Sequence, residues 1–261
     1  MMTSSTIKLS INQQNIDILM GGSGEPLVVL HHDIGNPGWL PFYNKLAENF
    51  TIYIPSLPGF DTSDRPDWMR SARDMATVCQ WMLREMDLTQ KPYLVGLGFG
   101  GWIAAELATT ASDSIRGMSL LNPMGLQPRE GEIMDQFIIS SEQYVQSGFT
   151  DLTSYHETFG DLPDVEQLVT WEINREMTTR IAWKPYMFDR SLETLLRAVD
   201  TPTQLIAGAD NQIVPPICCE QFAELIPSST VFQLEQCGHF ADIEKPRELA
   251  TLIYDFIKTK A

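Results

Sequence analysis

Short apolar runs alternate with helical patterns along most of the chain. Residues 7–11 and 15–20 alternate apolar with polar positions, and the polar Asn12-Gln13-Gln14 separates them, which predicts a β-hairpin. Residues 27–30 are all apolar, as a strand buried on both faces requires. Further strands are predicted at 51–54, 93–97, 117–121, 203–207 and 230–234, and helices at 39–49, 71–86, 99–110, 217–225 and 247–258.

The strand–helix alternation stops after Pro123 and resumes near residue 200. The intervening stretch has helical periodicity and many aromatic residues but no evident strand. We therefore predict an α/β core formed by residues 1–126 and 191–261, with a helical lid inserted as residues 127–190. The core is expected to contain a mostly parallel, eight-stranded sheet with helices on both faces.

Composition and charge narrow the possible partners. The 261 residues carry a net charge of −16, which disfavours binding to nucleic acid or to anionic membranes. The four cysteines form no C-x-x-C pair, which favours reduced thiols and a cytoplasmic location. The chain shows no signal peptide and no apolar run long enough for a membrane span, so we expect a small-molecule partner and no membrane partner.

A glycine-rich turn at 96–100 carries the first candidate chemistry. Gly96-Leu97-Gly98-Phe99-Gly100 follows an apolar strand and opens an Ala-rich helix, the pattern of a nucleophile elbow. The central residue of such an elbow projects its side chain from the rim of the sheet. Gly98 tolerates the strained backbone of this turn but has no side chain, so the elbow is expected to form without its nucleophile.

The same glycines also satisfy the dinucleotide-binding pattern G-x-G-x-x-G at Gly96, Gly98 and Gly101. Three observations disfavour this alternative. The motif follows about five strands rather than the first one, and the acidic residue about 20 positions later is Asp113, which lies in a turn. In addition, the motifs that surround this turn, described below, fit the elbow interpretation, so we expect no cofactor.

Two downstream residues complete a candidate acid–base pair. Asp210 lies in the loop after the strand at 203–207, and His239 follows the strand at 230–234 within Cys237-Gly238-His239-Phe240. The chain order of nucleophile position, acid and histidine is the one expected for an elbow of this kind. His239 is expected to act as a base near neutral pH, and Asp210 to fix its tautomer.

Two loops supply the remaining candidate site residues. Leu30-His31-His32-Asp33-Ile34-Gly35 resembles an H-G-x-x-G oxyanion loop, with His32 in place of glycine. The backbone N–H groups of Asp33 and Phe99 are the expected oxyanion donors. The side chains of His32 and Asp33 either point into the pocket or cap the turn. Residues 58–66 resemble a P-G-x-G-x-S loop with Asp61 in place of glycine, which predicts a structural loop near the hinge of the lid.

Together these motifs resemble the lidded α/β-hydrolase superfamily, and most closely its small-ester and carbon–carbon-bond hydrolases. The resemblance covers residues 6–259 and rests on the elbow, the Asp210 loop, the His239 motif and the two loops above. In that family the central elbow residue is Ser, Asp or Cys, so Gly98 is a departure that argues against an acyl-enzyme.

Three hypotheses follow. The first is a non-covalent His–Asp general-base enzyme acting on a small ester or ketone, or a related cofactor-free lyase or isomerase. The second is a non-catalytic small-molecule binding protein of the same fold. The third is a serine enzyme in which glycine was introduced deliberately at position 98, or replaced the serine by a single substitution, so that a substrate is trapped.

Two further clusters have competing interpretations. In the predicted lid, Arg175 and Arg180 could bind a substrate carboxylate, but nearby Glu172 and Glu176 favour surface ion pairs. His31, His32, Asp33 and His239 could in principle bind a metal ion. Adjacent histidines on a strand point to opposite faces, however, so no metal site is expected.

Overall fold

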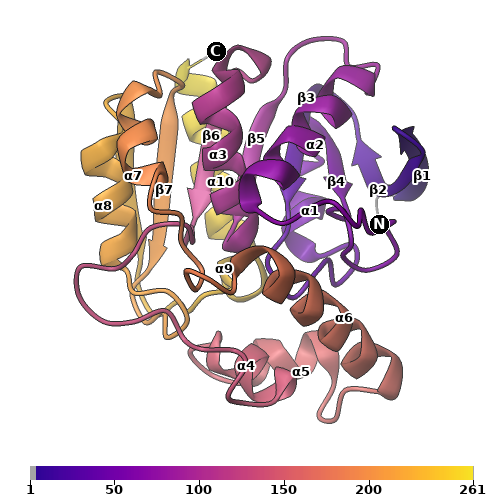
Figure 1. Ribbon diagram of the computed structural model, residues 1–261, viewed down its shortest axis with the longest axis vertical. Helices are drawn as coiled ribbons and strands as arrows, with labels where there is room; N and C mark the ends of the chain where they lie inside the picture. The colour runs from indigo at the N-terminus through magenta and orange to yellow at the C-terminus, as the bar shows by residue number, and fades with distance from the viewer. Residues whose placement is uncertain (1–3, 261) are drawn as a thin grey trace.

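A computed structural model describes residues 4–260 of the chain. Its centre is an eight-stranded sheet in the order β1-β2-β4-β3-β5-β6-β7-β8 (Figure 1). The strands β3 to β8 are mutually parallel, while β1 and β2 form an antiparallel hairpin that pairs antiparallel with β4. The predicted mostly parallel sheet and its hairpin are thus confirmed. The strands are β1 (Ser5–Ile11), β2 (Gln14–Gly22), β3 (Glu25–Leu30), β4 (Phe50–Pro55), β5 (Tyr93–Leu97), β6 (Gly117–Leu121), β7 (Thr203–Gly208) and β8 (Ser229–Leu234).

Helices cover both faces of this sheet, because its central strands are apolar on both sides. In β3, Val28 and Leu30 pack beneath α2, α3 and α8, whereas Leu27 and Val29 pack beneath α1 and α10. The core helices are α1 (Pro41–Leu46), α2 (Ala72–Glu85), α3 (Phe99–Ala111), α8 (Ile217–Leu225), α9 (Ala241–Glu244) and α10 (Pro246–Lys260). The short α9 was not predicted from the sequence.

A long helical insertion joins β6 to β7. It contains α4 (Ser141–Ser147), α5 (Thr153–Phe159) and α6 (Val165–Ala182), and the short α7 (Leu192–Leu195) follows it. Figure 1 shows α4, α5 and α6 together beyond one end of the sheet, on the side where α9 lies. We refer to residues 127–190 as the inserted segment. Its boundaries remain a prediction.

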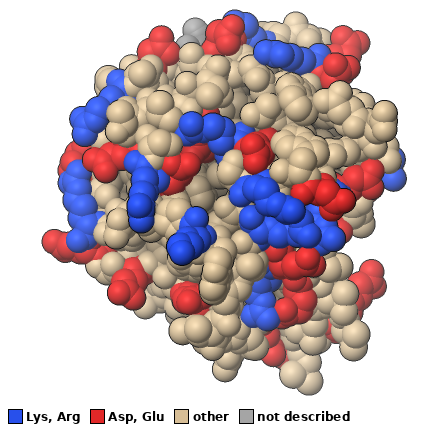
Figure 2. All heavy atoms as spheres, in the orientation of Figure 1, with Lys and Arg blue, Asp and Glu red and all other residues tan. Residues whose placement is uncertain are grey.

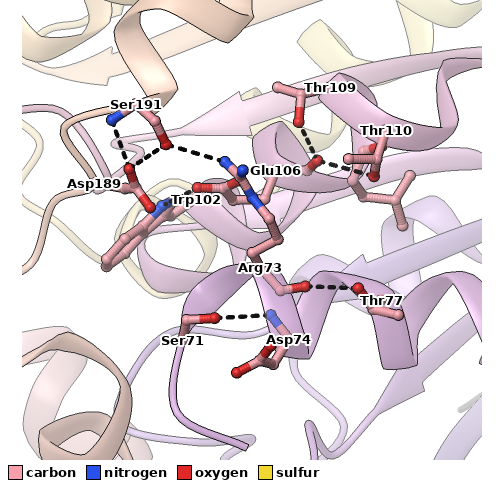
Figure 3. A network of polar contacts seen from close by, with 11 residues as sticks. Ser71, Arg73, Asp74, Thr77, Trp102, Glu106, Thr109, Thr110, Asp189 and Ser191 are labelled. Atoms are coloured by element: carbon pink, nitrogen blue, oxygen red, sulfur yellow. Dashed lines mark hydrogen bonds and ion pairs between the residues drawn. The ribbon is translucent and has the colours of Figure 1, made fainter.

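A buried carboxylate anchors the point where the inserted segment returns to the core (Figure 3). Glu106 of α3 is fully buried and accepts hydrogen bonds from Arg73 of α2 at 2.9 and 3.1 Å and from the Trp102 indole at 3.2 Å. Arg73 also donates to the hydroxyl of Ser191, which in turn donates to Asp189. The network therefore ties α2 and α3 to the end of the inserted segment.

The surface carries both signs of charge despite the acidic excess. On the face drawn in Figure 2, Lys and Arg side chains lie beside Asp and Glu side chains. The four cysteines are buried free thiols. Within residues 4–260, no helix has the length and apolar character needed to cross a membrane.

Candidate functional site

The turn between β5 and α3 has the predicted elbow geometry. Gly98 has φ +51° and ψ −107°, a conformation that side chains other than hydrogen strain to adopt. The glycines on either side allow close packing: a Cβ on Gly100 would lie 2.2 Å from the carbonyl oxygen of Leu30, and one on Gly96 would lie 2.6 Å from Cα of Gly101. Positions 96 and 100 thus leave no room for a Cβ, and the backbone conformation at position 98 favours glycine.

Two histidine rings face the point where a side chain of residue 98 would begin. A Cβ on Gly98 would lie 2.7 Å from Nε2 of His239 and 2.7 Å from Nδ1 of His32. The two ring centroids are 5.0 Å apart. A residue larger than glycine would therefore have to displace two buried rings, so the surrounding packing matches glycine at this position.

His239 is held from several sides. Its Nδ1 lies 3.2 Å from Nδ2 of Asn211, and its backbone N–H donates to the Gly148 carbonyl at 2.7 Å. Its carbonyl accepts from the Asn122 side-chain amide at 3.0 Å. The ring is fully buried, and this burial, together with the nearby His32, lowers the pKa of His239 well below its usual range. Both effects favour the neutral form of the His239 ring.

The expected partner of His239, Asp210, does not contact it. Asp210 is exposed, and its backbone N–H donates to the Cys237 carbonyl at 2.9 Å. The next residue, Asn211, points inward because its Oδ1 accepts from the backbone N–H groups of Ile213 and Val214 at 2.9 and 3.0 Å. The prediction that Asp210 is the partner of His239 is therefore wrong. Asn211, one residue further along the loop, lies beside Nδ1 of His239 instead.

His32 has the carboxylate partner that His239 lacks. Its Nε2 lies 3.0 Å from Oδ1 of Asp242, and both side chains are buried. Asp242 lies in α9, three residues after His239. Asp242 was not predicted from the sequence, where its only signal was its nearness to His239 along the chain.

The neighbouring histidine, His31, is structural. Its Nε2 accepts from the backbone N–H of Leu57 at 2.9 Å, so its Nδ1–H donates to the His32 carbonyl at 2.6 Å. The bond from Leu57 joins the loop after β3 to the loop after β4. Among residues 4–260, no cluster of three His, Cys, Asp or Glu side chains is arranged to bind a metal ion.

Asp33 points toward the inserted segment, whereas His32 points toward Gly98. Oδ2 of Asp33 accepts hydrogen bonds from the Tyr144 hydroxyl at 2.7 Å and from the Gln136 side-chain amide at 3.2 Å. Burial raises the pKa of Asp33, although the Tyr144 hydrogen bond opposes that shift. The sequence left the orientation of these two side chains open. In the structure His32 faces the elbow, and Asp33 bonds to the inserted segment.

The Phe99 side chain contributes packing to the site. Its buried ring lies against Phe60 and Trp102, with centroids 5.6 and 5.9 Å away. The role of the Phe99 and Asp33 backbone N–H groups as oxyanion donors remains a prediction.

Asp61 and Asn174 join the loop after β4 to α6. The Asp61 N–H donates to Oδ1 of Asn174 at 2.8 Å, and the Asn174 amide donates to Oδ1 of Asp61 at 2.9 Å. The same amide also donates to the Ile34 carbonyl at 2.8 Å. The predicted structural role of the loop containing Asp61 agrees with these contacts.

The two arginines of α6 both pair with glutamates of the same helix, and Arg175 also contacts an earlier part of the inserted segment. Arg175 pairs with Glu172 at 2.6 Å and donates to the carbonyls of Gln136 and Ile139, while Arg180 lies 3.6 Å from Glu176. These contacts favour the ion-pair interpretation over a carboxylate site.

A pocket of about 370 Å³ lies between the loop after β3 and the first turns of α6. Core residues that line it include Ile34, Gly38 and Asp61. From the inserted segment, Asp164, Glu166 and Trp171 complete the wall. Ile34 lies two residues from His32, so the pocket adjoins the loop that carries the two histidines.

Known proteins resemble this chain over most of its length. A family model for the alpha/beta hydrolase fold matches residues 26–246. Monoacylglycerol lipase ABHD6 of Rattus norvegicus is 26% identical, over 84% of this chain and 71% of that protein. The 2-hydroxymuconate semialdehyde hydrolase of Pseudomonas sp. (strain CF600) is 24% identical, over 90% of this chain and 88% of that protein.

Solved structures show the same fold. The CarC enzyme, a serine hydrolase involved in carbazole degradation, superposes with a TM-score of 0.80 at 18% identity. The match covers 98% of this chain and 100% of that one.

Proposed function

Because the chain belongs to the alpha/beta hydrolase fold family, we propose that it acts on a small carbonyl compound, an ester or a ketone, without a covalent intermediate. One observation carries this proposal: the nucleophile position is Gly98, and two imidazole nitrogens face it at 2.7 Å from where its Cβ would lie. Acid–base groups are therefore aimed at the reaction centre of the fold, although no attacking side chain stands there.

Chemistry without the nucleophile is physically reasonable at such a site. Hydrolases that lose a triad member keep a residual rate from substrate binding and oxyanion stabilisation. In this chain the backbone N–H groups of Asp33 and Phe99 are the proposed oxyanion donors.

The relatives support a small carbonyl substrate. By their names, one acts on monoacylglycerol and another on a muconate semialdehyde, and both compounds contain carbonyl groups. One structural neighbour is called a serine hydrolase, whereas this chain has Gly98 at the elbow. The relatives therefore support a carbonyl substrate for this chain, but they do not support a serine mechanism.

The inserted segment is proposed to act as a lid. Its residues Gly148, Tyr144 and Asn174 bond to the loops that carry His239, Asp33 and Asp61, respectively. A lid held in this way excludes water from the histidines, which strengthens electrostatic interactions with a bound substrate.

The pocket between the loop after β3 and α6, if a substrate enters through it, favours a neutral or cationic compound. Three of its lining side chains are the carboxylates Asp61, Asp164 and Glu166. A substrate carboxylate there would meet like charges, and Arg175 of α6 is already engaged by Glu172 and two carbonyls. Small neutral esters and ketones are therefore the first compounds to test.

A non-catalytic binding protein is the second candidate. Gly98 favours it, as does the complete burial of His239, because both also suit a pocket that holds a ligand unchanged.

One experiment separates the two candidates. The purified protein is incubated with a fluorophosphonate probe and, separately, with a panel of small neutral esters and ketones. The proposal predicts turnover of at least one compound, loss of that turnover in His32→Gln and His239→Gln, and no covalent label. Stoichiometric labelling of a side chain at the site contradicts it. Compounds that bind but are recovered unchanged support the binding protein instead.

A further inference from the structure

We infer that the two histidines facing Gly98 have opposite, fixed roles: His239 donates a hydrogen bond from Nε2, and His32 accepts a proton at Nδ1. The assignment follows from what each ring's other nitrogen contacts. The positioning residues are Asn211 for His239 and Asp242 for His32.

The orientation of the Asn211 amide determines the tautomer of His239. Its Oδ1 accepts from two backbone N–H groups, those of Ile213 and Val214, and a backbone N–H can only donate. The oxygen is thereby fixed on that side, so the NH₂ group faces Nδ1 of His239 at 3.2 Å. An NH₂ group only donates, so Nδ1 must accept. A neutral imidazole has one ring proton, which then lies on Nε2.

The Asp242 carboxylate determines the tautomer of His32. A carboxylate only accepts, so the Nε2 of His32, 3.0 Å away, carries a proton. In neutral His32 the other nitrogen, Nδ1, then has a free lone pair. This is the atom that faces the Gly98 Cβ position.

Both inward-facing atoms are unsatisfied. Nε2 of His239 and Nδ1 of His32 are buried and make no hydrogen bond within residues 4–260. Buried polar groups almost always have partners, and each exception needs an explanation. A donor and an acceptor thus face one point beside Gly98, and a ligand group that reaches it by shifting the two rings would need the matching polarity.

This arrangement reverses the usual one for the fold's histidine. In a Ser-His-Asp triad the carboxylate holds the proton on Nδ1, which leaves Nε2 free to act as a base. Here the residue beside Nδ1 of His239 is an amide, and the carboxylate belongs to His32 instead. The proton acceptor has therefore moved from His239 to His32.

This inference deepens the proposed function and, for the reaction class, rests on it. A neutral imidazole donor opposite a base is suited to removing a proton from carbon next to a carbonyl. The C–H bond breaks and its proton goes to Nδ1 of His32. The bonding pair forms a C=C bond, while the carbonyl π pair moves to oxygen, which accepts a hydrogen bond from Nε2 of His239. Return of the proton to carbon completes the cycle with no oxidant or reductant. The substrate class is thus a neutral ketone with a hydrogen on the adjacent carbon.

The ring tautomers are tested by ¹⁵N NMR of the full chain labelled at histidine, at a pH where the imidazoles are neutral. We expect both His32 and His239 to carry the proton on Nε2, with His31 as an internal control that carries it on Nδ1. Asn211→Asp is expected to move the His239 proton to Nδ1. A wild-type His239 that is protonated on Nδ1 overturns the inference, and this result does not depend on how the variant folds.

The reaction class is tested separately with cyclohexanone in D₂O, by following deuterium at its α carbons. We expect exchange that falls at least tenfold in His32→Gln. If the tautomers are as inferred but wild-type protein gives no exchange with cyclohexanone or the ketone panel, the proposed proton transfer is overturned while the tautomer assignment stands. If the His239 tautomer is reversed, the inference fails whatever the turnover.

Discussion

The side-chain amide of Asn211 donates to Nδ1 of His239 across 3.2 Å, at the place where a catalytic triad has a carboxylate. An amide does not stabilise the imidazolium form that a general base must adopt. Burial of the ring also disfavours the imidazolium form, since it lowers the pKa of His239. The two effects together favour the neutral form of His239.

Replacing Asn211 by aspartate should reverse this preference. The new carboxylate can accept from Nδ1–H and stabilise the imidazolium, so we expect proton binding to His239 to strengthen about tenfold or more. A pH titration of the ring carbon and proton resonances measures the change. Asp210→Asn is the matched control, because Asp210 is the exposed neighbour in the same loop and should leave the His239 titration unchanged.

Placing serine at position 98 should not produce a fast esterase. The side chain would enter a left-handed conformation and press on two buried rings, at a cost of about 1–3 kcal/mol in the free energy of unfolding. Denaturant unfolding measures the cost. Gly38→Ser is the control, since Gly38 also has positive φ but an added Cβ would meet nothing within 4 Å. Brisk ester hydrolysis by a fully stable Gly98→Ser protein would instead favour the single-substitution hypothesis.

Asp33→Asn should stabilise the fold most at high pH. Because burial raises the pKa of Asp33 in the folded chain, its contribution to stability is complete below the unfolded pKa and is lost as pH rises through the folded value. Asparagine avoids that loss and can still accept from Tyr144. We expect the variant to exceed wild type by about 1–2 kcal/mol at pH 8 and by less at a pH near the unfolded pKa of 3.8. Unfolding curves at both pH values test this, and an equal difference at the two would contradict it.

In the network around Glu106, removing only the cation should destabilise the fold more than removing both charges. Removing Arg73 leaves a buried carboxylate without its cation, so Arg73→Met is expected to cost about 2–3 kcal/mol of unfolding free energy, somewhat less than for a fully buried pair because Arg73 is 39% exposed. Adding Glu106→Gln removes the buried charge and should recover most of that loss. A double-mutant cycle by chemical denaturation measures both, and additive effects would count against the network.

The fold could be predicted because local pattern and global arrangement agree. The fully apolar run that became β3 requires burial on both faces, and the glycines at 96, 98 and 100 fit only a tight strand-to-helix turn. The position of His239 followed from the same logic, since its loop comes after a core strand.

The partners of the two histidines could not be predicted. Asp210 and Asn211 are adjacent, and which of them points inward depends on hydrogen bonds to Ile213 and Val214 within one loop. The His32–Asp242 pair joins residues 210 positions apart, across a contact that periodicity does not encode. Both partners thus depend on tertiary geometry rather than on a motif.

The most direct test of this account is neutron diffraction from a deuterium-exchanged crystal of the protein at a pH where the histidines are neutral. The account predicts deuterium on Nε2 of His239, directed at the space beside Gly98, and a bare Nδ1 on His32. Deuterium on Nδ1 of His239, with Nε2 bare, would restore the ordinary base to this site and contradict the account.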